Sequence, residues 1–335
     1  MQVSKIFVEK SLRNTKSLAA FITTFAKAEL HYIDNYENYF QRVKKPYLQK
    51  RDNNYIFLAE KKGNLVKEAP DAYGLSGEPH YYYIHAYNCM YECQYCYLQG
   101  YFHSPDLVFF LNHNDIINEM RRIYNMQRAN KIWFHAGEFS DSLALSHLTS
   151  ELPQYFAAFK EMPNAYLELR TKSANTKELE KLEPLENVYV SFSFSSHQAA
   201  KKYDLKTASI RTRIAAMKRL YAKGHKLAIH LDPIIDQANL YQDYSHALED
   251  LFAEIPADYF SYFSLGVVRF TKDVFEQTKK NYPASDMLAA NLITSFDGKV
   301  RYSKPLRDQI LLTMQNMLIR LGVAKERTYL CMEDS

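Results

Sequence analysis

The 335-residue sequence is poor in cysteine and has no long apolar run. Its four cysteines are too few for the disulfide framework of a secreted protein of this length. No apolar stretch reaches the length of a membrane span, and the first ten residues lack the apolar core of a secretory signal. We therefore expect a soluble, cytoplasmic protein that keeps its thiols reduced and has no membrane partner.

Positive charge is concentrated near the start of the chain. The net charge is +4, but residues 1–62 hold twelve Lys and Arg against six Asp and Glu. The segment 42–51 has no acidic residue and five basic ones, namely Arg42, Lys44, Lys45, Lys50 and Arg51. A local excess of this kind suits a polyanion such as DNA, and a solvated basic face explains it at least as well.

After residue 79, strand and helix patterns alternate along the chain. Apolar and β-branched runs predict strands at 80–87, 131–136, 165–170, 187–194, 226–231 and 262–270. Apolar residues at helical spacing predict helices between them, at 114–129, 210–224 and 244–255. Alternation of this kind implies a parallel sheet with helices packed outside it. Six units predict an α/β fold with a partial (β/α)6 barrel, similar to a TIM barrel but open.

The ends of the chain differ from this alternating part. A cluster of Pro and Gly between residues 70 and 79 marks a boundary, so we predict a small N-terminal α/β domain at 1–78 and the partial barrel at 79–290. An Asp297-Gly298 turn predicts a hairpin at the start of a C-terminal extension, 291–335. A helical pattern at 306–322 and a strand pattern at 327–331 complete this extension, which we expect to pack on the barrel.

Three of the four cysteines lie close together after the first predicted strand of the barrel. Cys89, Cys93 and Cys96 have the spacing C-x3-C-x2-C. Their loop follows a parallel strand, which is where the active sites of barrel enzymes are built. A structural zinc site needs a fourth ligand, and the sequence has no second Cys pair to supply it. Three thiolates suit an iron–sulfur cluster that keeps one iron open for another ligand.

The same spacing is the signature of the radical S-adenosylmethionine (radical SAM) superfamily, and its surroundings resemble the spore photoproduct lyase family. The loop NCMYECQYCYLQ at 88–99 resembles the cluster loop of that family. Further segments resemble the family in order along almost the whole chain: 140–149, 170–173, 192–209, 230–235, 297–307 and 329–333.

The resemblance implies a role for each matching residue. Cys89, Cys93 and Cys96 would bind a 4Fe-4S cluster. Cofactor contacts would come from Gly137 and Glu138, at the place of the family's Gly-Gly-Glu motif, and from Ser140, Lys172 and Ser193. Tyr95 and Tyr97 match the tyrosines that assist radical transfer back to the cofactor.

The resemblance also implies a reaction. In this family the reduced cluster cleaves S-adenosyl-L-methionine, and a deoxyadenosyl radical attacks a methylene-bridged thymine dimer in ultraviolet-damaged DNA. The cofactor carries the difficult chemistry, and the lesion must leave the base stack to reach it. An electron donor such as flavodoxin or ferredoxin would reduce the cluster. Two alternatives stay open: a radical SAM enzyme of the same fold with another substrate, and a metal-bearing nucleic-acid-binding module without turnover.

One departure from the family concerns the hydrogen donor. The family's donor cysteine corresponds to Glu138 in this sequence. Cys331, which follows the last predicted strand, and Tyr97 are the candidate replacements, although a free cysteine is more often a small buried hydrophobe. Two basic residues of the hairpin, Lys299 and Arg301, are expected to face DNA phosphates.

Several candidate residues also have an ordinary structural interpretation. Glu138 precedes SDSL and suits the start of a helix, where an acid is favourable. Lys172 suits a solvated strand end. For His85, His135 and His230, we expect satisfied histidines in the core or lining the barrel interior.

Overall fold

The computed structural model describes residues 2–41, 54–70, 77–127, 130–288 and 292–333. The basic segment 42–51, including Lys44 and Lys45, lies outside these residues.

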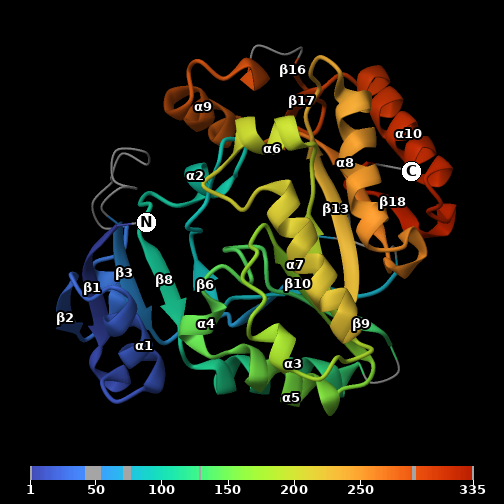
Figure 1. The fold of residues 1–335 in the computed structure, drawn as a ribbon. Coiled ribbons are helices and arrows are strands. Elements are labelled where there is room, and N and C mark those ends of the chain that lie inside the picture. Colours follow the sequence, from blue (N-terminus) through green and yellow to red (C-terminus); the bar gives the residue numbers. More distant parts are fainter. Residues whose placement is uncertain (1, 42–53, 71–76, 128–129, 289–291, 334–335) are drawn as a thin grey trace.

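An eight-stranded central sheet forms the larger part of the protein (Figure 1). Its order is β4 (Val66–Glu68), β5 (His80–Tyr83), β9 (Ile132–His135), β10 (Ala165–Thr171), β11 (Val188–Ser193), β13 (Lys226–Ile234), β14 (Phe263–Val267) and β18 (Thr328–Leu330), read from one edge to the other. All pairs from β5 to β18 are parallel, and β4 pairs antiparallel with β5. Because these strands are parallel, their carboxyl ends lie at the same end of the sheet.

Helices cover the outside of this sheet. The main ones are α3 (His113–Met126), α5 (Leu152–Lys160), α7 (Ile210–Lys223), α8 (Leu240–Glu254) and α10 (Lys304–Arg320). Ser209 caps the start of α7 through a bond from the Thr212 N–H, and Gly224 ends the helix with a φ of 84°, a conformation that favours glycine. The strands between these helices are mostly buried, which explains their long apolar runs. The predicted alternation of strands and helices is confirmed.

A second sheet lies beside the first, drawn in blue to green in Figure 1. Its order is β2 (Glu29–Ile33), β1 (Val3–Glu9), β3 (Asn54–Ala59), β8 (Leu107–Phe110) and β6 (Ala86–Tyr87), with α1 (Lys16–Thr24) packed at its side. The predicted strand 80–87 is therefore two strands in two sheets. The N–H of Ile84 bonds to Leu65, whereas the carbonyl of His85 accepts from Phe110 in the second sheet. Strands from both sides of the predicted boundary at 78–79 build this sheet.

The C-terminal extension contains the predicted hairpin. β16 (Leu292–Thr294) and β17 (Val300–Tyr302) pair antiparallel, and β15 (Arg269–Phe270) joins β17 at its other edge. The predicted final strand, β18, extends the central sheet beside β14. The remaining described elements are short: α2 (Leu98–Tyr101), α4 (Ser146–Thr149), α6 (His197–Tyr203), α9 (Lys272–Asn281), β7 (Glu92–Cys93) and β12 (Asp204–Leu205).

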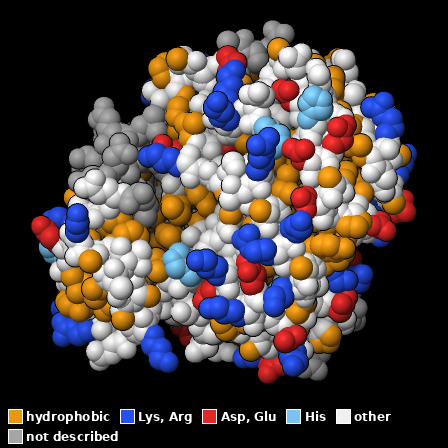
Figure 2. Space-filling model, viewed as in Figure 1, with side chains coloured by type: hydrophobic (Ala, Val, Ile, Leu, Met, Phe, Trp, Pro, Cys, Tyr) orange, Lys and Arg blue, Asp and Glu red, His pale blue; other side chains and the backbone are white. Residues whose placement is uncertain are grey.

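The surface over α7 and α8 carries both signs of charge. Figure 2 shows Lys and Arg intermixed there with Asp and Glu, which does not favour this face as a polyanion-binding surface. None of the helices in the described ranges is long and apolar enough to span a membrane.

Candidate active site

A cavity of about 640 Å³ lies where the cysteine loop meets the carboxyl ends of the central strands. Ten of the eleven predicted site residues line it: Cys89, Cys93, Tyr95, Cys96, Tyr97, Gly137, Glu138, Ser140, Lys172 and Ser193. These residues come from four separate segments of the chain. The eleventh, Cys331, lies behind the wall, next to the lining residue Met332.

The cysteine loop is held against the segment that follows α6. β7 pairs with β12, with Cys93 opposite Asp204, and the N–H of Gln94 donates to the Tyr203 carbonyl at 2.9 Å. Within the loop, the N–H of Cys96 donates to the Cys93 carbonyl at 3.0 Å. This tight turn helps to bring the three cysteines of the loop to the same cavity.

The three cysteines form no disulfide among the described residues, and Cys93 is the most deeply buried of them. Burial raises the pKa of the Cys93 thiol well above its usual value, and the charge of Lys172 opposes this effect. Among the described residues, no group of three or more His, Cys, Asp or Glu side chains forms a site for a single metal ion. Thiolates are the usual ligands of iron–sulfur clusters, and all three cysteines line one cavity.

The two loop tyrosines have defined partners. The hydroxyl of Tyr95 donates to the carboxylate of Asp204, which also accepts from the fully buried Arg213 at 2.9 Å. The ammonium of Lys172 lies 5.3 Å from the centre of the Tyr95 ring. The hydroxyl of Tyr97 donates to the backbone carbonyl of Glu138, which links the cysteine loop to the end of β9.

Asp141 joins two of the cavity segments, and sequence reasoning missed it. Its carboxylate accepts from the N–H groups of Leu143 and Ala144 at 3.0 and 2.9 Å, within its own loop. It also accepts from the Thr171 hydroxyl and the Lys172 N–H, both at 2.7 Å. These four bonds place Lys172 and Ser140 beside each other at the ends of β10 and β9. The side chain of Lys172 is deeply buried, which disfavours its charge, yet Cys93 and Asp204 raise its pKa above the usual value.

Glu138 does not start a helix, because residues 137–145 are not helical and α4 begins at Ser146. Burial raises the pKa of the Glu138 carboxyl, and Arg170 opposes this effect. The preceding residue must be small, because a Cβ at Gly137 would lie 2.8 Å from the Cβ of Arg170. The structure therefore favours a cavity-facing role for Glu138.

Charged residues that sequence reasoning missed line the other side of the cavity: Arg170, Asp232 and Arg269. Asp232 receives two hydrogen bonds of 3.0 Å from the guanidinium of Arg269. Gly266 makes room for this pair, since a Cβ there would lie 2.8 Å from the Asp232 carboxylate. Arg170 and Asp232 lie near the carboxyl ends of β10 and β13, and Arg269 begins β15, shortly after β14 ends. The sequence alone does not show which distant residue a charged side chain in such a position contacts.

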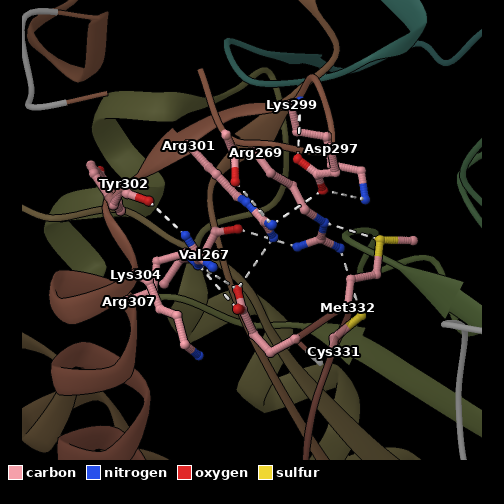
Figure 3. A network of polar contacts seen from close by, with 12 residues as sticks. Val267, Arg269, Asp297, Lys299, Arg301, Tyr302, Lys304, Arg307, Cys331 and Met332 are labelled. Carbon is pink, nitrogen blue, oxygen red and sulfur yellow. Dashed lines mark hydrogen bonds and ion pairs between the residues drawn. The ribbon is translucent and has the colours of Figure 1, made fainter. Parts of the chain in front are cut away.

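The C-terminal tail is bound to this charged side (Figure 3). The Arg269 guanidinium faces two sulfur atoms, Sδ of Met332 at 3.2 Å and Sγ of Cys331 at 3.6 Å. Glu333 then accepts two hydrogen bonds from Nε of Arg307, at 2.9 and 3.0 Å. Burial raises the pKa of the Cys331 thiol to about 11, with Asp232 adding to the effect, so the sulfur stays protonated.

The expected contact of Arg301 with DNA phosphates is wrong. Its side chain is only 4% exposed and pairs with Asp297 at 3.1 Å. Lys299 also pairs with Asp297, at 3.4 Å, but it lines the cavity and is partly exposed.

The three histidines are buried and bond to carboxylates, as predicted, but they are not fully satisfied: Nε2 of His85 and Nδ1 of His230 have no hydrogen-bond partner among the described residues. His135 and His230 bond to the carboxylate of Glu168, and His85 bonds to that of Glu151 at 3.1 Å.

A family model described as spore photoproduct lyase matches residues 76–300. The spore photoproduct lyase of Bacillus subtilis (strain 168) is 28% identical to this chain over 206 residues. That alignment covers 60% of this chain and 60% of the relative, so it spans less than two thirds of the relative's length.

Two similar solved structures cover more of the chain. One is a spore photoproduct lyase complexed with dinucleoside spore photoproduct, with a TM-score of 0.81 at 17% identity over 98% of this chain and 97% of that one. The other is a mutant with bound AdoMet and the same dinucleoside, with a TM-score of 0.80 at 18% identity over 100% of this chain and 98% of that one. At these identities the likeness shows a common α/β fold.

Proposed function

This chain belongs to the spore photoproduct lyase family, and from that premise we propose that it is a radical SAM lyase that acts on a thymine dimer in ultraviolet-damaged DNA. One observation carries the proposal. Three cysteines of one loop line the same cavity as Glu138, Lys172 and the other predicted cofactor contacts, although these residues lie far apart in the chain.

The proposal includes the finer architecture. We infer that the parallel strands from β5 to β14 form an open (β/α)6 barrel, since they follow one another in chain order and their carboxyl ends surround one cavity. Residues 1–78 would be a small N-terminal domain that β6 and β8 complete and whose β4 pairs with β5 of the central sheet. Residues 291–335 would be an extension packed on the barrel with its hairpin, helix and last strand.

The residues present fit the cofactors of this chemistry. Cys89, Cys93 and Cys96 would bind three irons of a 4Fe-4S cluster and leave the fourth for S-adenosyl-L-methionine. When bound, the two groups supply the reducing electron and the deoxyadenosyl radical. The electron itself would come from a small donor protein such as flavodoxin or ferredoxin.

The protein's own side chains would bind and orient the cofactor. Glu138 would accept from its amino group, and the ammonium of Lys172 would bind its carboxylate. Gly137 leaves room for the approach, and the hydroxyls of Ser140 and Ser193 line the same cavity. Asp141 joins its own loop to the end of β10. Two of its four hydrogen bonds lie within the loop, and the other two come from Thr171 and Lys172.

Two residues would serve the return of the hydrogen atom. Cys331 lacks direct contact with the cavity, but its sulfur lies against Arg269, which does line it, and its thiol stays protonated. A hydrogen donor needs a weak X–H bond, which the S–H of a protonated thiol or the O–H of a tyrosine can supply. Tyr97 lines the cavity beside Cys96, and Tyr95 lies under Lys172. We assign both tyrosines to radical transfer and propose Cys331 as the donor, with Tyr97 as the competitor.

The test of the function has two steps. Protein reconstituted anaerobically with iron and sulfide should cleave S-adenosyl-L-methionine when a reductant is added. The same preparation should then convert a synthetic dinucleotide spore photoproduct into the dinucleotide with two undamaged thymines, its phosphodiester intact. Cofactor cleavage without lesion cleavage would mean a radical SAM enzyme with another substrate. Absence of both would mean a metal-bearing binding module.

The DNA partner has its own test. Phosphate contacts make affinity fall with salt, each with a slope of about 0.9 in a log–log plot. The double change Lys44→Glu and Lys45→Glu should weaken DNA binding across all sequences and reduce this slope, measured by fluorescence anisotropy at several salt concentrations. Salt-independent binding would exclude phosphate contacts from this segment.

A further inference from the structure

A buried carboxylate lies behind the cavity, in the interior of the central sheet. Glu168 of β10 has a side chain that is only 1% exposed. Five side chains donate to it: Ser191 and His230 at 2.7 Å, Tyr262 at 2.8 Å, Arg170 at 3.2 and 3.3 Å, and His135. Burial alone would raise the pKa of Glu168, but Arg170, His230 and His135 hold it well below its usual value.

This arrangement calls for a function, because it is a costly way to fill the interior of a sheet. Apolar residues such as Val, Ile and Leu usually occupy such positions in barrels. Replacement of a buried ionic cluster by apolar residues is often neutral or stabilising, so fold stability alone gives little reason for it. Of the five donors, only Arg170 lines the cavity.

Arg170 is therefore the point where the buried cluster meets the cavity. It lies two residues after Glu168 in β10, on the same face of the strand. Its side chain is 23% exposed, whereas that of Glu168 is 1% exposed, so the cation borders open space and the carboxylate lies behind it. The lack of a side chain at Gly137 lets the end of β9 pack directly against Arg170.

Arg269 provides a contrast on the same wall. Its guanidinium is used to hold the protein together, through Asp232, the Val267 carbonyl and the sulfur atoms of the tail. Arg170 bonds to a buried carboxylate of its own strand, that of Glu168. Because the buried carboxylate of Glu168 fixes the orientation of this guanidinium, its N–H groups have a defined direction for donation to a ligand.

We propose that Arg170 is a substrate-contacting residue whose guanidinium donates to an acceptor oxygen of the lesion, and that Glu168 is the positioning residue that orients it. The proposal rests on the proposed function, since the oxygen belongs to a thymine dimer. Two oxygens of that substrate share the required chemistry: a base carbonyl, and the phosphodiester that joins the two nucleosides.

Binding measurements with two probes test the proposal and separate the two oxygens. The probes are the dinucleoside photoproduct, which has no phosphate, and the dinucleotide photoproduct. Arg170→Gln should weaken binding by about 10-fold to 100-fold, the usual effect of losing a hydrogen bond to a charged group. Weaker binding of both probes assigns the contact to a base carbonyl, and weaker binding of the dinucleotide alone assigns it to the phosphodiester. Unchanged affinity for both probes, in protein that unfolds at the parent temperature, overturns the proposal.

Three further variants exclude a merely structural role. Arg170→Lys keeps the charge, folds with less disturbance and should still raise KM for the lesion more than it lowers kcat. Glu168→Gln should weaken lesion binding, and the double variant with Arg170→Gln should be no weaker than Arg170→Gln alone, because Glu168 acts through Arg170. Arg122→Gln removes an exposed arginine of α3 that pairs with Glu119, and it is the matched control with parent affinity.

Two other outcomes have distinct meanings. A loss of affinity for S-adenosyl-L-methionine equal to the loss for the lesion would assign Arg170 to the cofactor and overturn the proposal. If the parent protein cleaves the cofactor but neither binds nor cleaves the lesion, the proposed substrate is wrong, and the assignment of Arg170 to that substrate is wrong with it. Parent protein that repairs the lesion, beside an Arg170→Gln variant with the same KM, refutes the proposal about Arg170 alone.

Discussion

The two sides of the cavity are built in different ways. One side is the cysteine loop, in which residues 89–97 are consecutive and hold their shape through a tight turn. The other side combines Arg170, Asp232 and Arg269 with the C-terminal tail, so each contribution comes from a different part of the chain. The first side matches the conserved chemistry of the family. The second side carries the charges that we connect with the substrate. The three proposed cluster ligands thus come from one loop, whereas the proposed contacts with S-adenosyl-L-methionine and with the substrate come from distant parts of the chain.

The cysteine loop should show the largest effect of substitution. Changing Cys89, Cys93 or Cys96 to Ala should remove the cluster and abolish cofactor cleavage, because each thiolate binds a separate iron. Iron and sulfide content and the visible spectrum after anaerobic reconstitution measure this. Cys331→Ala is the matched control and should keep the cluster. Loss of the cluster in Cys331→Ala would contradict the three-ligand assignment.

Glu138 should show the next largest effect. Glu138→Gln removes the negative charge proposed to face the cofactor's amino group and should lower affinity for S-adenosyl-L-methionine by about 10-fold to 100-fold. Equilibrium dialysis measures that affinity. Glu138→Cys restores the residue type that the family has there, and it should impair cofactor binding in the same way. Better lesion repair by Glu138→Cys with normal cofactor affinity would show that Glu138 does not bind the cofactor.

The proposed hydrogen donor, Cys331, lies behind the cavity wall, next to the lining residue Met332. Cys331→Ala should retain cofactor cleavage but lose clean product, because the product radical then has no S–H bond nearby. Tyr97→Phe should have the smaller effect on product. Mass spectrometry of product formed in deuterated solvent measures hydrogen return in each variant. If both variants yield the parent product with the parent label, neither residue is the donor.

Substitution in the C-terminal tail should have the smallest effect, and this effect should be on the stability of the protein. Glu333 has a side chain that is 10% exposed and accepts two hydrogen bonds from Arg307. Glu333→Gln should therefore lower the free energy of unfolding by about 1–3 kcal/mol, as expected for a hydrogen bond between charged groups. Urea denaturation measures it, with the exposed Glu326→Gln of the same segment as control. Equal stability in the two variants would mean that this ion pair does not hold the tail.

Much of the fold was predictable from local pattern. The central strands and their helices follow from apolar runs and helical spacing, and the hairpin follows from the Asp297-Gly298 turn. The predicted strand 80–87 was wrong in one respect, because it leaves the central sheet after Tyr83 and enters the second sheet at Ala86. A continuous apolar run looks the same whether one sheet or two sheets bury it.

The sequence by itself determined the cysteine loop, the alternation of strands and helices and, through family resemblance, ten residues of the cavity lining. These features depend on neighbours in the chain or on short motifs. The contacts between distant residues follow from the tertiary structure alone: Glu168 accepts from Arg170, Asp141 joins the loop after β9 to the end of β10, and Arg301 is buried against Asp297. The tertiary structure also decided that the tail reaches Arg269. The reason is physical: the partner of a charged side chain depends on which distant strand ends the sheet brings together, and no local spacing records that.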